Sequence, residues 1–272
     1  MRGKGGGRAL NPFFFGSSKS PLYGVYHPPR SGSGPSKAVL LCYPMGAEYM
    51  RAHRAFRQVT TLLVKGGAHV LRFDYFGTGD SAGEGVEATV ARWQDDIATA
   101  LEELKESAQV KRVTLIGLRF GGTLAALAST GRADVEQVVL WDPIIDGARY
   151  VADLLATHEQ EQRARRASAD QPVAGVHGFP VTAGQRREIA SIDLSSWSGV
   201  ANCRIDLITS CERQEAAELV RRLRSAGRTA NATVFPSNGN WAESDAFGSA
   251  LIPQSIIQGV LGSVLVDEVS VV

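Results

Sequence analysis

Between Thr114 and Ser129 the sequence TLIGLRFGGTLAALAS reads as a strand, a tight glycine turn and a helix of small residues. This succession constrains the fold more than any other feature. Gly117 and Gly121 flank a turn in which the strand and helix backbones come too close for side chains. The central residue, Arg119, is therefore expected in a strained, exposed position at the carboxyl end of the strand.

Apolar runs that predict buried strands alternate with amphipathic segments along most of the chain. Strands are expected in residues 37–44, 69–76, 112–117, 135–145, 203–212 and 231–237, and helices in residues 51–67, 86–109, 213–227 and 253–265. Residues 11–29 read as two short strands joined by a Gly-Ser turn, which predicts an antiparallel hairpin. Strands that alternate with helices at this spacing indicate the α/β class and a mostly parallel sheet.

The domain organisation follows from length and from one break in this alternation. A chain of 272 residues fits one large domain or two small ones. We expect a flexible tail over residues 1–11 and one domain over residues 12–272. Residues 146–197 turn polar and charged, and they leave from the end of a strand where active sites form. They are therefore predicted to be an inserted lid, with a solvated surface excursion as the alternative.

Composition excludes several classes of function. The net charge of +1 gives no electrostatic reason to expect nucleic acid or an anionic membrane as a partner. No apolar run approaches the roughly 20 residues that span a bilayer. Three cysteines without a Cys-x-x-Cys pair predict neither a disulfide framework nor a metal site. We expect a protein of the reducing cytoplasm, without a metal or cofactor.

Several segments together resemble a known superfamily. PFFFGSSKSPLYGVYHPP, LLCYPMGAEYMRAHRAF, VLRFDYFGTGDSAGE and LWDPIIDG look like the α/β-hydrolase superfamily and its serine-aminopeptidase-like group. Within that group the chain is most similar to the exosortase-associated hydrolases, and FDYFGTGDS matches their D-x-x-G-x-G-x-S loop. The resemblance implies a mostly parallel central sheet with an N-terminal antiparallel hairpin, helices on both faces and an inserted lid, in a bacterial setting.

The catalytic residues of that superfamily are not all present. Arg119 occupies the position of the serine nucleophile, and an arginine cannot lose its proton to become one. The family histidine would fall in PSNGNWAESDAF, which has none; Asn240 or Trp241 stands near its place. The acid position corresponds to Glu212. A triad that lacks nucleophile and base loses most of its rate, so ordinary serine hydrolysis is not expected.

Arg119 has two interpretations that are compatible with each other. At a helix N-terminus, where free amides already favour anions, a guanidinium makes a strong site for a carboxylate or phosphate. Alternatively, Arg119 forms an internal salt bridge with Asp142, at the end of the adjacent strand, or with Glu212. The oxyanion donors would be the amide of Phe120 and that of either Met45 or Gly46.

Two functions follow from these residues. The first is a divergent enzyme that acts on an acyl, ester, thioester or amide small molecule, or catalyses a non-hydrolytic step. Arg119 would polarise the substrate, and the acid or base would come from Asp142, Glu212 or His53. The second is an inactive pseudo-hydrolase that binds an anionic ligand or a partner protein, with its pocket filled by the Arg119 salt bridge and Trp241. His53 has a plainer interpretation as a helix-surface histidine.

Overall fold

The computed structural model describes residues 11–30, 37–167, 175–237 and 254–265. An eight-stranded sheet forms the centre of this part of the chain, in the order β1-β2-β4-β3-β5-β6-β7-β8. The strands are β1 (Asn11–Phe15), β2 (Leu22–His27), β3 (Ala38–Cys42), β4 (His69–Phe73), β5 (Val113–Leu118), β6 (Val135–Trp141), β7 (Arg204–Thr209) and β8 (Thr229–Val234). The predicted tail lies outside the described residues except for Asn11.

Strand directions agree with the sequence pattern. β2 runs antiparallel to β1 and β4, whereas the pairs from β4 through β8 are parallel. Every residue of β3 and β5 is buried, as expected for central strands covered on both faces. The predicted hairpin and mostly parallel sheet are confirmed.

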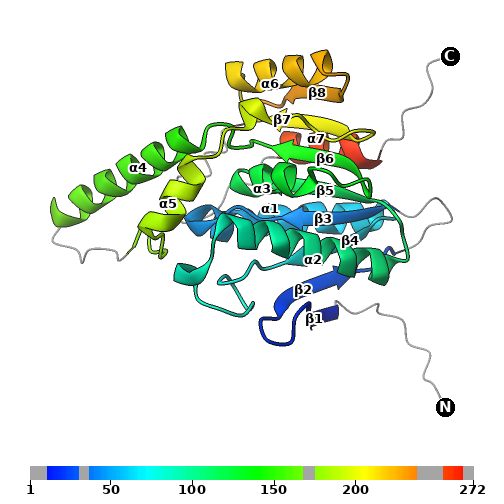
Figure 1. Cartoon of the computed structure of the whole chain (residues 1–272), viewed down its shortest axis with the longest axis horizontal. Coiled ribbons are helices and arrows are strands. Elements are labelled where there is room, and N and C mark those ends of the chain that lie inside the picture. Colours follow the sequence, from blue (N-terminus) through cyan, green and yellow to red (C-terminus); the bar gives the residue numbers. More distant parts are fainter. Residues whose placement is uncertain (1–10, 31–36, 168–174, 238–253, 266–272) are drawn as a thin grey trace.

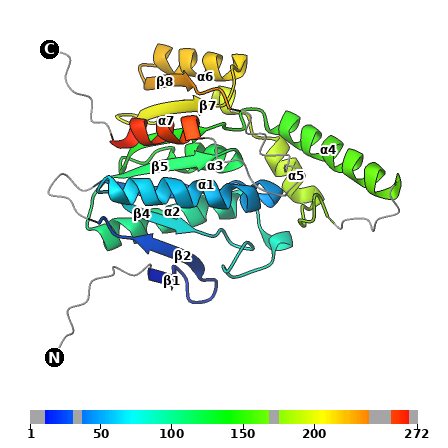
Figure 2. The same cartoon turned by 180° about the vertical axis from the view of Figure 1, so that it is seen from behind.

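Helices cover both faces of the sheet. They are α1 (Gly46–Lys65), α2 (Val90–Ala108), α3 (Phe120–Ser129), α4 (Gly147–Ala167), α5 (Ala183–Ala190), α6 (Gln214–Ser225) and α7 (Gln254–Leu265), with short 3-10 turns η1 (Gly85–Glu87) and η2 (Leu194–Ser196). α2 and α3 lie in front of the sheet in Figure 1, and Figure 2 shows α1 and α7 on the opposite face. None of the described helices is long and apolar enough to span a membrane.

The segment between β6 and β7 contains two helices. α4 and α5 pack against each other and project beyond the body of the sheet in Figure 1. Asp146 and Asp193 form an isolated antiparallel bridge, so the excursion leaves and returns at neighbouring positions. A Cβ on Gly147 would lie 1.9 Å from the Ile189 carbonyl oxygen, which shows how closely the start of α4 packs against the end of α5. The role of these helices as a lid stays a prediction.

One helix boundary differs from the expectation in a way that matters for the site. A helix was expected from residue 51, but α1 begins at Gly46, whose φ of +60° turns the chain out of β3. Met45 is the N-cap in an extended conformation. The earlier start places Glu48 in the first turn of α1, at the same sheet edge as Arg119.

Candidate functional site

The turn between β5 and α3 has the geometry of a nucleophile elbow. Arg119 has φ of 54° and ψ of −125°, in the positive-φ region that ordinary residues avoid. A Cβ on Gly117 would lie 2.4 Å from the Gly121 carbonyl oxygen, and one on Gly121 would lie 2.3 Å from that of Cys42. Both glycines are therefore required by backbone contact, as predicted. The turn holds the Arg119 side chain at the carboxyl edge of the sheet.

The Arg119 side chain forms a salt bridge with a carboxylate that the sequence did not single out. Its Nε donates to Oε1 of Glu48 at 2.9 Å, and both side chains are largely buried, with 16% and 7% exposed. Burial acts to lower the pKa of Arg119, but the carboxylate of Glu48 raises it above its ordinary value. The guanidinium therefore stays charged, and its charge is balanced inside the protein.

Tyr150 of α4 completes this cluster. Its hydroxyl donates to Oε2 of Glu48 at 3.3 Å, and the Arg119 guanidinium carbon lies 5.8 Å from its ring centroid. The same ring stacks on Phe120, with centroids 6.1 Å apart and planes 6° from parallel. Burial, together with Glu48, raises the pKa of Tyr150 well above its ordinary value, so the phenol remains a donor. We refer to Arg119, Glu48 and Tyr150 as the elbow cluster.

The predicted salt bridge of Arg119 with the side chain of Asp142 or Glu212 was wrong. Asp142 does lie at the end of β6, but its Oδ1 accepts the amide and hydroxyl of Ser210 at 2.7 and 3.0 Å. Arg213 approaches the same oxygen at 4.0 Å. Arg119 reaches only the backbone carbonyl of Asp142, at 3.5 Å. Glu212 is exposed and has no salt bridge to Arg119.

Two hollows meet at Arg119. The elbow cavity, of about 90 Å³, is lined by residues that include Met45, Gly46, Glu48, Arg119, Tyr150 and His177. The outer cleft, of about 460 Å³, is lined by residues that include Arg119, Asp146, Arg149, Tyr150, Glu212 and Arg213. The predicted residues Met45, Gly46 and Glu212 therefore do surround Arg119.

The backbone on this edge can provide the predicted oxyanion donors. Phe120 is the first residue of α3 and Met45 precedes the first residue of α1. Amides in a first helical turn have no acceptor within their own helix. Asn240 and Trp241, predicted to stand near the position of the family histidine, lie outside the described residues.

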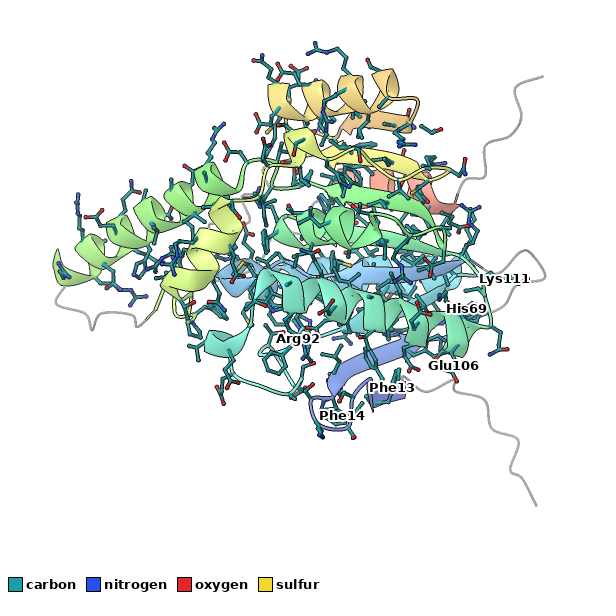
Figure 3. All side chains as sticks on the ribbon, in the orientation of Figure 1. Phe13, Phe14, His69, Arg92, Glu106 and Lys111 are labelled. Carbon is teal, nitrogen blue, oxygen red and sulfur yellow. The ribbon has the colours of Figure 1, made fainter. Side chains whose placement is uncertain are left out.

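None of the five histidines, all within the described residues, hydrogen-bonds to the elbow cluster. His69, the first residue of β4, and His27, which pairs with Val70 of β4, lie at the amino end of the parallel strands; Figure 3 labels His69 far from α4 and α5. His158 and His177 contact each other.

His53 belongs to a different hollow. It lies against the rings of Tyr43 and Tyr49, with centroids 5.4 and 5.2 Å away, in a cavity of about 420 Å³ that also contains Arg72. Burial and then Arg72 lower its pKa. The predicted acid or base role beside Arg119 is not supported by this placement, because Arg119 does not line that cavity.

The remaining candidate nucleophiles have structural roles or lie apart. Burial raises the pKa of Cys42 to about 12, so its thiol stays protonated. Ser81 donates to the Asp74 carbonyl at 2.5 Å and accepts the Tyr23 amide at 2.8 Å. These two bonds show that Ser81, the serine of the D-x-x-G-x-G-x-S loop, stabilises its own turn. Cys211 is exposed and lines the outer cleft.

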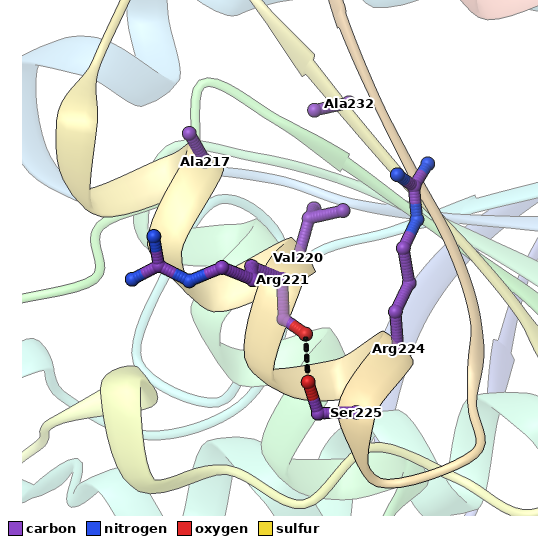
Figure 4. A pocket seen from close by; sticks show the side chains of 6 residues that line it. All are labelled: Ala217, Val220, Arg221, Arg224, Ser225 and Ala232. Atoms are coloured by element: carbon purple, nitrogen blue, oxygen red, sulfur yellow. Dashed lines mark hydrogen bonds between the residues drawn. The ribbon is translucent and has the colours of Figure 1, made fainter.

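A further cavity is unrelated to the elbow cluster. It lies between α6 and β8, has a volume of about 470 Å³, and is lined by apolar residues together with Arg221 and Arg224 (Figure 4). The Ser225 hydroxyl in its wall donates to the Arg221 carbonyl at 3.0 Å. Neither arginine lines the elbow cavity or the outer cleft, which makes Arg224 a useful control position.

Comparison with known proteins gives a family match. The model of the family described as serine aminopeptidase, S33, matches residues 34–192, more than half of the chain. Palmitoyl-protein thioesterase ABHD10, mitochondrial, of Homo sapiens is 33% identical over 91 residues, which are 34% of this chain and 26% of that protein. The Mus musculus protein is 35% identical over 68 residues, 25% of this chain and 22% of that protein. The match thus spans about a quarter of the length of these relatives.

Solved structures share the fold at low sequence identity. An esterase from Pyrococcus furiosus has a TM-score of 0.65 and 16% identity, covering 84% of this chain and 82% of that one. A proline iminopeptidase-related protein from Thermus thermophilus has a TM-score of 0.63 and 16% identity, covering 94% and 99%. The thioesterase domain from the curacin biosynthetic pathway has a TM-score of 0.56 and 15% identity, covering 93% and 100%. These likenesses establish the α/β-hydrolase fold.

Proposed function

The chain belongs to the serine aminopeptidase, S33, family, and from this membership we propose that it binds an acyl-bearing or carboxylate-bearing small molecule without serine hydrolysis. One observation carries the proposal: the elbow that positions a serine in such a fold holds Arg119, whose Nε lies 2.9 Å from the buried Glu48 carboxylate. A guanidinium cannot attack a carbonyl carbon, but it can hold a carbonyl or carboxylate oxygen.

The geometry supports an oxygen of the ligand as the group that is bound. Nε of Arg119 is used by Glu48 and Nη1 faces the Asp142 carbonyl, while Nη2 has no hydrogen-bond partner among the described residues. Met45 is the N-cap of α1 and Phe120 is the first residue of α3, so both amides lie at helix N-termini on the same edge, where helix dipoles favour negative charge. The thioesterases and esterase among the similar proteins act, by their names, on acyl compounds, and this favours an acyl group as the bound moiety.

The absence of serine chemistry can be tested directly. The full chain would be incubated with a fluorophosphonate probe and examined by intact-protein mass spectrometry. We expect no adduct, because an unactivated serine does not react at a useful rate. Stoichiometric modification of any serine would overturn the proposal.

Binding can be tested by calorimetry with a series of alkyl carboxylates and their methyl esters. We expect saturable binding to the wild type, and at least ~10-fold weaker binding after Arg119→Ala, the loss of one charge-assisted hydrogen bond. Arg224→Ala removes an arginine from the cavity of Figure 4 and serves as the matched control. Equal loss in both variants, or no binding to the wild type, would contradict the assignment.

A second candidate function is favoured by the contact between Glu48 and Tyr150. A carboxylate and a phenol 3.3 Å apart beside the elbow cavity could pass a proton to and from the carbon next to a bound carbonyl. In D₂O, NMR would then show exchange of that carbon's protons in a thioester ligand, and Glu48→Gln would stop the exchange. A wild type that binds the ligand without exchange would leave binding as the function.

A further inference from the structure

Three ionisable side chains outside the elbow cluster converge between α4 and the turn that precedes α5. They are His158 and Glu161 of α4 and His177, and one ligand atom from each lies within 4.8 Å of the others. His158 and Glu161 are three residues apart, so they share one face of the helix. Imidazole nitrogen and carboxylate oxygen are the ligands that Zn²⁺ takes in proteins besides thiolate.

The local backbone holds His177 against the helix. Val176 and Phe179 form an isolated antiparallel bridge, and His177 and Gly178 occupy the tip with φ values of 50° and 85°. The His177 amide donates to Nδ1 of His158 at 3.2 Å, and the two rings lie 5.3 Å apart. The lone pair of His158 Nδ1 is therefore directed toward the turn and accepts this amide, while Nε2 of the same ring lies 3.5 Å from Nε2 of Gln162. A metal ion would replace one of these two contacts.

Both ring nitrogens of His177 face oxygen acceptors. Its Nδ1 lies 2.7 Å from Oε2 of Glu161, and its Nε2 lies 3.2 Å from the carbonyl oxygen of Leu154. With the proton on Nε2, which can donate to the Leu154 carbonyl, the lone pair of Nδ1 faces the carboxylate oxygen of Glu161. A histidine that donates to a backbone carbonyl while its other nitrogen is free for a metal is the usual arrangement in metal sites.

We propose that His158, Glu161 and His177 bind a divalent transition metal ion, with Zn²⁺ as the best match to the ligands. In a tetrahedral site with Zn–N and Zn–O bonds of about 2.0–2.2 Å, neighbouring ligand atoms lie about 3.3–3.6 Å apart. Nδ1 of His177 and Oε2 of Glu161, now 2.7 Å apart, would therefore move slightly apart to admit the ion. The Glu161 side chain is 45% exposed and can make this movement, while the His177 side chain is 10% exposed and already oriented. Three protein ligands leave the fourth tetrahedral position to water.

This site is independent of the proposed function. Its effect would be to fasten the turn at residues 176–179 to α4, next to the elbow cavity that His177 helps to line. Metal binding displaces protons from imidazole, so affinity would fall as the pH is lowered.

Calorimetry with ZnCl₂ on the untagged full chain, first treated with EDTA, tests the proposal. We expect one ion per chain with a dissociation constant of ~10 µM or tighter. Co²⁺ in the same site would give the visible absorption of a tetrahedral N/O complex. His177→Ala and His158→Ala should each weaken binding at least ~10-fold. His53→Ala, which removes an exposed imidazole from α1, is the matched control.

Glu161→Gln provides a variant that keeps the shape of the side chain, in case an alanine variant fails to fold. It should lower the affinity and raise the proportion of Co²⁺ left in octahedral aqueous form. A wild type that binds no Zn²⁺ at 1:1 stoichiometry, or that binds it equally well after His158→Ala and Glu161→Gln, would overturn the metal site.

Discussion

Nε of Arg119 lies 2.9 Å from Oε1 of Glu48, and the two residues are 71 positions apart in the chain. Arg119 follows β5 as the N-cap of α3, and Glu48 lies in the first turn of α1, so the contact joins the nucleophile position to the helix that follows β3. Two opposite charges at this depth are stable only together, because either one alone would be buried without compensation. The pair therefore occupies the elbow as a structural unit as well as a candidate binding group.

Removing the carboxylate should destabilise the protein. Glu48→Gln leaves the Arg119 guanidinium without its counter-charge, and we expect a loss of about 3 kcal/mol in the free energy of unfolding, measured by urea titration. Glu215→Gln removes an acidic residue from the first turn of α6, where no salt bridge is described, and should cost less than about 1 kcal/mol. Similar losses in the two variants would mean that the Arg119–Glu48 pair contributes little.

Tyr150 should stabilise the docking of α4 more through its ring than through its hydroxyl. Tyr150→Phe removes one hydrogen bond to Glu48 and should cost about 1 kcal/mol of unfolding free energy. Tyr150→Ala also removes the ring stacked on Phe120 and should cost about 3–5 kcal/mol. Equal costs for the two substitutions would show that the hydroxyl carries the interaction.

Features read from local pattern were predicted well. The alternation of buried strands and amphipathic helices indicated the sheet, and the spacing of Gly117 and Gly121 indicated the elbow. Both depend on short segments whose periodicity or backbone demands are visible in the residues themselves. The same reasoning located Arg119 and Met45 at one edge, because the carboxyl ends of parallel strands meet there.

Long-range side-chain partners could not be predicted in this way. Nothing in GAEYM distinguishes Glu48 from an ordinary acidic residue in a first helical turn, where it complements the helix dipole. Asp142 was the more obvious partner for Arg119 because it ends the neighbouring strand, but its carboxylate turns to Ser210. The rotamer that each of these side chains adopts depends on tertiary packing. The meeting of His158 with His177 depends in the same way on how the segment after α4 folds back.

The two elbow glycines should tolerate no side chain. Gly117→Ala would place a Cβ 2.4 Å from the Gly121 carbonyl oxygen and 2.5 Å from the Gly122 Cα, so that backbone and not a flexible side chain would have to move. We expect a loss of more than about 4 kcal/mol of unfolding free energy or failure to fold, seen by circular dichroism. Gly184→Ala in α5 meets only the Thr182 hydroxyl, at 3.6 Å, and should be neutral or stabilising by up to about 1 kcal/mol. A folded Gly117→Ala protein of normal stability would contradict the elbow geometry.

His27 should make stability depend on pH between about 4 and 6.5. Burial, and then the charge of Arg72, lowers the pKa of His27 from its ordinary 6.5 to about 4. Arg72 Nε donates to His27 Nε2 at 3.3 Å, which requires the neutral ring. In this pH range the unfolded chain binds a proton that the folded chain does not, so the free energy of unfolding falls as the pH is lowered.

The pKa change alone would give a loss of about 3 kcal/mol by pH 4, and solvent screening of the only partly desolvated ring reduces the expected loss to about 2 kcal/mol, measured by urea titrations at several pH values. His27→Gln keeps an acceptor for Arg72 but cannot titrate, so the pH dependence of its stability should be shallower by about the same amount. Parallel curves for the wild type and His27→Gln would show that His27 is protonated in the folded protein as readily as in the unfolded chain.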